Sequence, residues 1–281
     1  MKDLKTRNIL WRVFLSGSLL LGLAAVASAQ EREDRTCSPA SVAGRWGYTE
    51  TGTVYLPAGP IPYASVGSYT IDADGNLSGE RTASAGGKTI PATIKGTATV
   101  DPDCTGKLTL AFFDDKGNQI AAATKFVVYD DHAREARAVV TSSPTALTTN
   151  AKKLFHDRAC SNASVAGQWG YTTTGTVFPP PTGAASPVAI VGIATFDDEG
   201  TLSATHTNTT GGKAKEETLK GTFTVSSDCI GTFSVTVYDQ SGSPVRAATW
   251  YFVIDDHRSE LRAIYTSAAG LRPARTQVPL P

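Results

Sequence analysis

The sequence carries no excess of charge of either sign, because its 26 lysines and arginines are matched by 26 aspartates and glutamates. Nucleic-acid binding requires basic side chains gathered on one face of a protein, and no basic stripe occurs along this chain. Beyond the first 30 residues the chain also lacks an apolar run of the roughly 20 residues that span a bilayer. We therefore expect neither a nucleic-acid partner nor insertion into a membrane.

Recognisable catalytic motifs are missing as well. The nucleophile signature G-x-S-x-G does not occur, and it would need a strand-to-helix turn. Two of the four histidines, His156 and His206, have no counterpart in the internal repeat described below. The sequence thus predicts a protein without catalysis and without a cofactor.

The first 29 residues have the layout of a secretory signal peptide. Four basic residues among the first twelve precede an apolar stretch over 13–26, and the small-x-small triplet Ala27-Ser28-Ala29 follows it. Signal peptidase cleaves after such triplets, whereas a membrane anchor needs a longer apolar run. We expect cleavage after Ala29 and a secreted or periplasmic protein.

The remainder of the chain is one unit written twice. Residues 37–57 match residues 160–180 at 16 of 21 positions, and residues 66–142 match residues 191–267 at 34 of 77 positions. Each copy has the size of an independent domain. We predict this order along the chain: signal peptide 1–29, first domain 37–143, linker 144–159, second domain 160–269 and disordered tail 270–281.

All four cysteines lie within the two copies, where an exported protein keeps its disulfides. Pairing inside each copy joins Cys37 to Cys104 and Cys160 to Cys229, which respects two separately folding units. A crossed pairing would tie the copies together. We expect one disulfide per domain.

Apolar residues alternate with polar ones between the predicted turns, which is the pattern of strands with one wet face. Ile90, Ala92 and Ile94 share one face, while Thr93 and Lys95 lie on the other. Short turns that begin with aspartate and end with glycine connect the strands. A meander of this length packs as a sandwich or closes into a barrel. We favour an all-β protein with two tandem antiparallel up-and-down barrels of seven to eight strands each.

Each copy begins its first predicted strand with the tripeptide G-x-W, as GRW at 44–46 and GQW at 167–169. This tripeptide resembles the signature of lipocalins and the wider calycin group. The strand count is equally similar to barrels of the allene oxide cyclase and dirigent type. Either resemblance implies a small barrel, and the lipocalin one implies binding of a small apolar ligand inside it.

The lipocalin resemblance also implies a contact between this tryptophan and an arginine on the last strand. In this chain it would bring Arg137 to Trp46 and Arg262 to Trp169.

A block of acidic residues and a histidine, D-D-H-x-x-E, occurs at 130–135 and again at 255–260. Its carboxylates and imidazole are groups that ligate cations or act as a base. The alternative is a turn between two strands, in which the aspartates cap backbone N–H groups. We favour the turn and predict no metal site. The ligands of a metal bound here would be Asp131, His132, Glu135, Asp256, His257 and Glu260.

Aromatic residues recur at equivalent places in the two copies, where they either line a cavity or fill a core. Glu50 shares a face with Trp46 and Tyr48, and a buried carboxylate needs a partner, for which Arg137 is the candidate. The second copy has Thr173 at this place, so the two interiors would differ in charge. The candidate ligand-binding residues are Trp46, Tyr48, Glu50, Arg137, Trp169, Tyr171 and Arg262, with Trp250 and Tyr251 as further aromatic candidates.

Three functions follow from these patterns. We favour a secreted, non-enzymatic two-barrel protein with the capacity to bind a small apolar ligand. The second is a structural or adhesive envelope protein that acts through its tandem surfaces. The third is an enzyme or metal binder that uses the D-D-H-x-x-E turns. No pattern in the sequence specifies the ligand or the oligomeric state.

Overall fold

The computed structural model describes residues 36–130, 132–142, 144–154, 159–178, 185–255, 259–266 and 274–279, the last range for its backbone only. Residues Cys37–Pro281 form one compact unit. The predicted signal peptide, 1–29, lies outside the described residues. No helix among the described residues reaches the length and apolarity needed to cross a bilayer.

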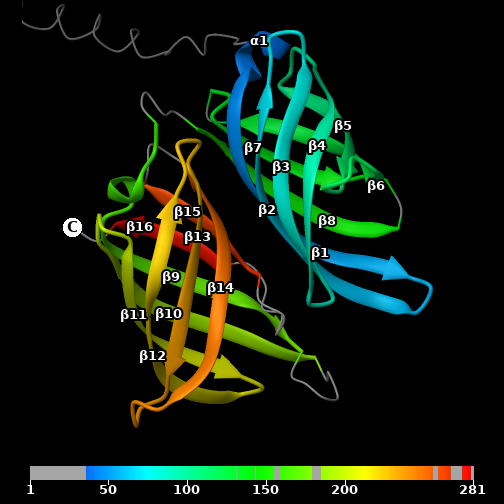
Figure 1. Ribbon diagram of the computed structural model, residues 1–281. Helices are drawn as coiled ribbons and strands as arrows, with labels where there is room; N and C mark the ends of the chain where they lie inside the picture. The colour runs from blue at the N-terminus through cyan, green and yellow to red at the C-terminus, as the bar shows by residue number, and fades with distance from the viewer. Residues whose placement is uncertain are drawn as a thin grey trace, which may run out of the picture. The chain divides into compact units, whose positions relative to one another are not determined.

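Eight antiparallel strands form the first barrel, and each pairs with the next in chain order until the last pairs with the first (Figure 1). A single helical turn, α1 (Pro39–Val42), precedes them and is capped by Ser38. The strands are β1 (Gly44–Leu56), β2 (Gly59–Ile71), β3 (Asn76–Ala85), β4 (Lys88–Val100), β5 (Thr105–Phe113), β6 (Gln119–Asp130), β7 (Glu135–Val140) and β8 (Thr145–Lys153).

The second barrel repeats this topology, and again its eight strands close into a ring. A short 3-10 turn, η1 (Asn162–Ser164), takes the place of α1. The strands are β9 (Gly167–Val177), β10 (Ser186–Phe196), β11 (Thr201–Thr210), β12 (Lys213–Val225), β13 (Ile230–Tyr238), β14 (Pro244–Asp255), β15 (Glu260–Tyr265) and β16 (Ala274–Pro279). The predicted all-β fold with two antiparallel up-and-down barrels is confirmed.

The acidic turns fold as their sequences predict. At the β2–β3 turn the Asp72 carboxylate accepts hydrogen bonds from the backbone N–H groups of Asp74 and Asn76. Gly75 then adopts a φ of +85°, a left-handed conformation that glycine enters without steric cost. This local chemistry fixes the register of the hairpins and therefore which side chains point inward.

Two closing strands lie where the sequence analysis predicted other structure. Residues 144–159 were expected to be a linker, but Thr145–Lys153 is β8, which pairs with β7 and β1. Residues 270–281 were expected to be a disordered tail, but Ala274–Pro279 is β16, which pairs with β15 and β9. The inward residues of β8 are Leu147, Thr149 and Ala151, of which only one is large and apolar. Alternation is therefore faint in β8, although closure still pairs the sheet edges.

Each barrel has its own apolar core and its own disulfide. Cys37 bonds to Cys104 and Cys160 to Cys229, as predicted. The buried Trp46 indole donates to the Val42 carbonyl oxygen at 3.0 Å, and the second copy repeats this bond between Trp169 and Val165 at 2.8 Å. The G-x-W tryptophans thus hold the turn before the first strand against the core.

A further apolar cluster joins side chains from the two barrels, which therefore pack against each other within the compact unit. Its fully buried members include Ala64 and Val66 on β2, and Val253 and Ile264 on β14 and β15.

Candidate functional site

A buried ion pair crosses the interior of the first barrel. The Lys125 ammonium on β6 bonds to the Glu50 carboxylate on β1, and both side chains are almost fully buried. The Thr149 hydroxyl donates to the same carboxylate at 2.7 Å, and Lys125 also lies 2.9 Å from that hydroxyl. The position of Glu50 beside Tyr48 agrees with the face predicted for it. Its partner, however, is Lys125 rather than Arg137.

The surroundings of Glu50 favour its charged form. Burial by itself raises the pKa of this carboxyl, but the Lys125 ammonium and the hydrogen bonds outweigh burial, so the pKa lies below its ordinary value. Arg81 adds a second positive charge, with its guanidinium 3.5 Å from the Phe112 ring centre and bonded to the Tyr63 hydroxyl at 2.6 Å. The first interior is therefore filled by a polar layer between apolar side chains.

The second barrel has different residues at the matching positions. In the repeat, Thr173 replaces Glu50, Trp250 replaces Lys125 and His206 replaces Arg81. The Trp250 ring stacks on Phe233 with ring centres 4.8 Å apart. The second interior thus exchanges an ion pair for an aromatic pair, and the two interiors differ in charge.

A hydrogen-bonded chain ends in this interior. The Tyr171 hydroxyl lies 2.7 Å from Nδ1 of His206, and Nε2 of His206 lies 2.9 Å from the Glu217 carboxylate. An ionised carboxylate only accepts hydrogen bonds, so Nε2 carries a proton, and in the neutral imidazole Nδ1 then accepts from the Tyr171 hydroxyl. These two hydrogen bonds therefore orient the Tyr171 phenol and leave the lone pairs of its oxygen available to a hydrogen-bond donor.

Glu217 is held ionised by three donors. Arg246 binds its carboxylate with two nitrogens at 2.8 and 2.6 Å, and Asn208 donates at 2.6 Å. Burial opposes the charge, but the hydrogen bonds from His206, Arg246 and Asn208 hold the pKa of Glu217 well below its usual range. Burial and the nearby carboxylate also raise the pKa of Tyr171, which keeps the phenol protonated.

The two interiors leave unequal space. The cavity in the first barrel measures about 10 Å³, whereas that in the second measures about 50 Å³. The second cavity is lined mainly by apolar side chains, with Trp250, Tyr171, Thr173 and His206 among its walls. His206 also lines an open hollow of about 910 Å³, so this side chain belongs to the walls of both spaces.

The arginines assigned by the lipocalin resemblance lie on the opposite side of the barrel wall from the tryptophans. Ala136 and Ala138 on either side of Arg137 belong to the first core, so strand alternation turns Arg137 outward, where it is exposed. The nearby cation of Trp46 is instead Lys153, 5.7 Å from its ring centre. The contact between Arg137 and Trp46 that the resemblance implied is therefore wrong.

Arg262 is buried, but outside the second barrel's own core. Its neighbours Leu261 and Ala263 face that core, where Trp169 lies. Arg262 points the other way and donates to Thr49 Oγ1 at 3.2 Å and to the Asn150 carbonyl oxygen at 3.3 Å, both in the first barrel. The contact between Arg262 and Trp169 that the resemblance implied is also wrong.

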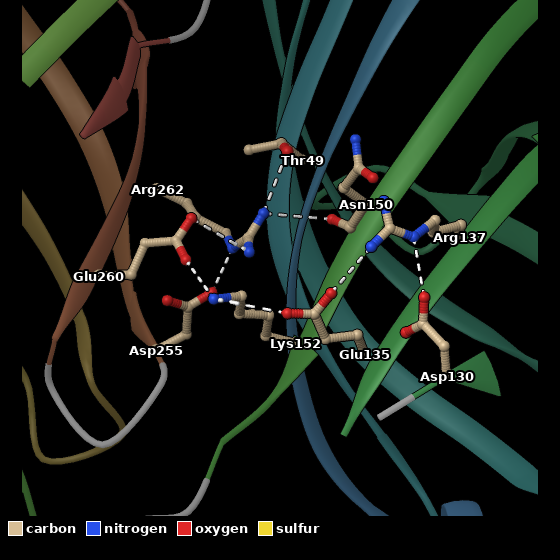
Figure 2. A network of polar contacts seen from close by, with 9 residues as sticks. All are labelled: Thr49, Asp130, Glu135, Arg137, Asn150, Lys152, Asp255, Glu260 and Arg262. Atoms are coloured by element: carbon tan, nitrogen blue, oxygen red, sulfur yellow. Dashed lines mark hydrogen bonds and ion pairs between the residues drawn. The ribbon is translucent and has the colours of Figure 1, made fainter. Parts of the chain in front are cut away.

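The two D-D-H-x-x-E blocks lie between β6 and β7 and between β14 and β15, and their described glutamates, Glu135 and Glu260, both lie near one lysine (Figure 2). Lys152 lies 3.0 Å from Glu260 and 3.7 Å from Glu135. Asp255 bonds to Arg262 beside this lysine. Burial raises the pKa of Asp255 to about 7, against the opposing effect of the Arg262 guanidinium.

The metal ligands considered for these blocks are placed only in part. His132 is exposed with a φ of +58°, and Glu135 and Glu260 take part in the network of Figure 2. Asp131, Asp256 and His257 lie outside the described residues. Within the described part of the chain, no three histidine, cysteine, aspartate or glutamate side chains are grouped as a metal site.

Of the predicted aromatic residues, Trp46, Tyr48 and Trp169 pack in the cores, and Tyr171 lines the second cavity. Trp250 also lines the second cavity, whereas Tyr251 packs against the apolar cluster between the barrels. Glu217 and Arg246 were not predicted from the sequence. His206 stands out in the sequence only as a histidine without a counterpart in the other copy, and that divergence from the repeat was the available signal.

Comparisons with known proteins give no family. No protein-family model matches the chain, and no curated protein matches it. A candidate AttH protein from Nitrosomonas europaea is 8% identical over 84% of this chain and 92% of its own, with a TM-score of 0.23. A β-barrel-like protein of the DUF1849 group from Brucella abortus is 12% identical over 84% and 95%, with a TM-score of 0.21. Likeness this low carries no argument, and the fold described above rests on the strand pairing.

Proposed function

We propose that the protein is a secreted, non-enzymatic binding protein in which the second barrel takes up one small apolar ligand and the first barrel is structural. The observation that carries this proposal is the contrast between matched interiors. The Glu50–Lys125 pair fills one, while Thr173 and Trp250 leave an apolar cavity in the other.

The residues around the second cavity suggest the chemistry of the ligand. Ligand sites are mostly apolar with a few placed polar groups, and Tyr171 with His206 supplies such a group. Because the phenol donates to His206, its oxygen is suited to accept a hydrogen bond from a ligand hydroxyl or amine. The G-x-W tripeptides, which resemble those of lipocalins, are consistent with this proposal.

The size of the cavity limits the ligand. A volume of about 50 Å³ is less than the roughly 150 Å³ of a cavity that accepts benzene. A single-ring ligand therefore requires Trp250, which is only partly buried, to turn aside. Binding should consequently change the fluorescence of Trp250.

Two measurements test the proposal. Native mass spectrometry of protein from its own host should reveal a bound small molecule, and phenol should bind saturably in a tryptophan fluorescence titration. Ala204 lines the cavity, so Ala204→Leu should abolish phenol binding, whereas the same change at the exposed Ala247 should not. A ligand-free mass spectrum together with no saturable binding by the unmodified protein would overturn the proposal.

A structural or adhesive role is the second candidate, and a specific observation favours it. The outer wall of the first barrel exposes Phe126, Val128 and Val139, which are 47%, 40% and 43% exposed. Phe126 pairs directly with Val139 across β6 and β7, so these side chains form one patch. Contiguous apolar patches on a soluble protein commonly mark interaction sites.

A further inference from the structure

The two barrels contact each other through unlike faces. The second barrel contributes what we call the arginine face, formed on β14 and β15 by Tyr251, Val253, Asp255, Arg262 and Ile264. The first barrel contributes the glycine face, formed on β1 and β2 by Gly47, Thr49, Ala64 and Val66. A Cβ atom on Gly47 would lie 3.2 Å from Val253 and 3.3 Å from Asp255, so a residue without a side chain lets the faces approach.

The repeat gives the first barrel an arginine face of its own. Its residues, aligned with those of the second barrel, are Phe126, Val128, Asp130, Arg137 and Val139. Arg137 Nε binds Asp130 at 2.9 Å, and Arg262 Nε binds Asp255 in the same way. The difference between the copies is exposure, since Val253 and Ile264 are fully buried while Val128 and Val139 are solvent-exposed.

The second barrel likewise has a glycine face. Gly170, Ala189 and Val191 occupy the positions of Gly47, Ala64 and Val66 in the same strand register. Val191 is 59% exposed, and Ile193, which replaces Ser68, is 41% exposed. Both exposed apolar patches are thus counterparts of the surfaces that are buried together inside the chain.

We propose that the arginine face of the first barrel in one molecule binds the glycine face of the second barrel in another molecule, repeating the contact between the barrels of one chain. The occupant of each patch is then a second copy of this chain. Because the contact joins unlike faces, each bound molecule still offers one face of each kind. Such heterologous contacts produce rings or open filaments.

The intermolecular contact is expected to be weaker than the one within the chain. The strand register places Gln277 opposite Glu260, where the first barrel has Lys152 opposite Glu135. At this register position the second barrel therefore has a glutamine where the first barrel has the lysine that bridges Glu135 and Glu260. Two separate molecules also lose translational and rotational freedom that the joined barrels do not. Assembly should accordingly depend on concentration.

Sedimentation velocity on the full exported chain tests the proposal over a wide concentration series. Val128→Asp alters the arginine face and Val191→Asp alters the glycine face, and each should weaken association by roughly tenfold or more. Val245→Asp is the matched control, because Val245 is 48% exposed and belongs to neither face. Circular dichroism establishes that each variant is folded, and Val128→Ser replaces Val128→Asp if the latter is not.

Mixing the two variants provides the decisive measurement. The Val191→Asp chain keeps an intact arginine face and the Val128→Asp chain keeps an intact glycine face, so the mixture should form one-to-one dimers and nothing larger. A monomeric unmodified protein at every concentration would overturn the proposal. So would loss of association in only one of the two variants, which indicates a symmetric contact, or a mixture that remains monomeric. These outcomes are independent of ligand binding by the second barrel.

Discussion

Removing the ammonium from the buried ion pair of the first barrel should be among the most destabilising single changes in that domain. In Lys125→Met the Glu50 carboxylate stays buried, with the Thr149 hydroxyl as its remaining hydrogen-bond partner and Arg81 as a more distant positive charge. Breaking a buried pair on one side costs about 3–5 kcal/mol. A loss of that size is a large part of the roughly 5–15 kcal/mol by which domains are stable.

Urea unfolding followed by circular dichroism measures this loss. Lys107→Met is the matched control, because Lys107 is exposed and should change stability by no more than about 0.5 kcal/mol. The double variant Glu50→Leu, Lys125→Met removes both charges and should recover most of the loss, because an apolar replacement of a buried pair is often neutral or better. If Lys125→Met unfolds at the same urea concentration as the control, the buried ammonium does not stabilise the first barrel by this amount.

The pH dependence of the same variant gives a second check. In the unmodified protein the pKa of Glu50 is lowered, so its stabilisation is present above the unfolded pKa and is lost as the pH falls through the folded value. Without Lys125, burial should raise that pKa instead. The difference in unfolding free energy between the variant and the unmodified protein should therefore shrink in acid.

Two further predictions concern the polar groups outside the first interior. Arg262→Met leaves Asp255 buried without the guanidinium that binds it, and should lower the free energy of urea unfolding by about 3–5 kcal/mol. Arg137→Met, at the exposed equivalent position, should lower it by at most about 1 kcal/mol. Equal losses in the two variants would contradict this prediction. Because the pKa of Glu217 is lowered, the stability that its carboxylate contributes is lost as the pH falls below about 5. Glu217→Gln should therefore flatten the acid side of a plot of urea midpoint against pH. An unchanged slope would count against a stabilising role for this carboxylate.

Local patterns predicted most of the architecture. Alternation in β4, the aspartate turns that end in a left-handed glycine, and the cysteine spacing all depend on interactions between near neighbours or on the repeat. Closure was harder to predict, because β8 turns mostly small or polar residues inward, such as Thr149 and Ala151. A strand that closes a barrel by pairing with both neighbours can therefore lack a strong hydrophobic alternation of its own.

The candidate site was predicted less well than the fold, for a related reason. Comparison of the two copies identifies the residues that they share. His206, Glu217 and Arg246 are not shared, because the first copy has Arg81, Ala92 and Ala121 at those positions. Their contacts depend on which strands become neighbours and on which face each side chain takes. The Glu50 partner illustrates this, since Lys125 reaches it across the interior from a strand 75 residues away in the sequence.

The arginine that binds its neighbouring aspartate in both copies has a different energetic weight in each barrel. On the open surface of the first barrel such a pair adds little stability, because water and salt screen both charges. In the second barrel the same two side chains are buried, so the loss of either one leaves an uncompensated charge. One bonded geometry is therefore a minor surface feature in one barrel, while in the other it makes the folding of that barrel sensitive to the residues that cover it.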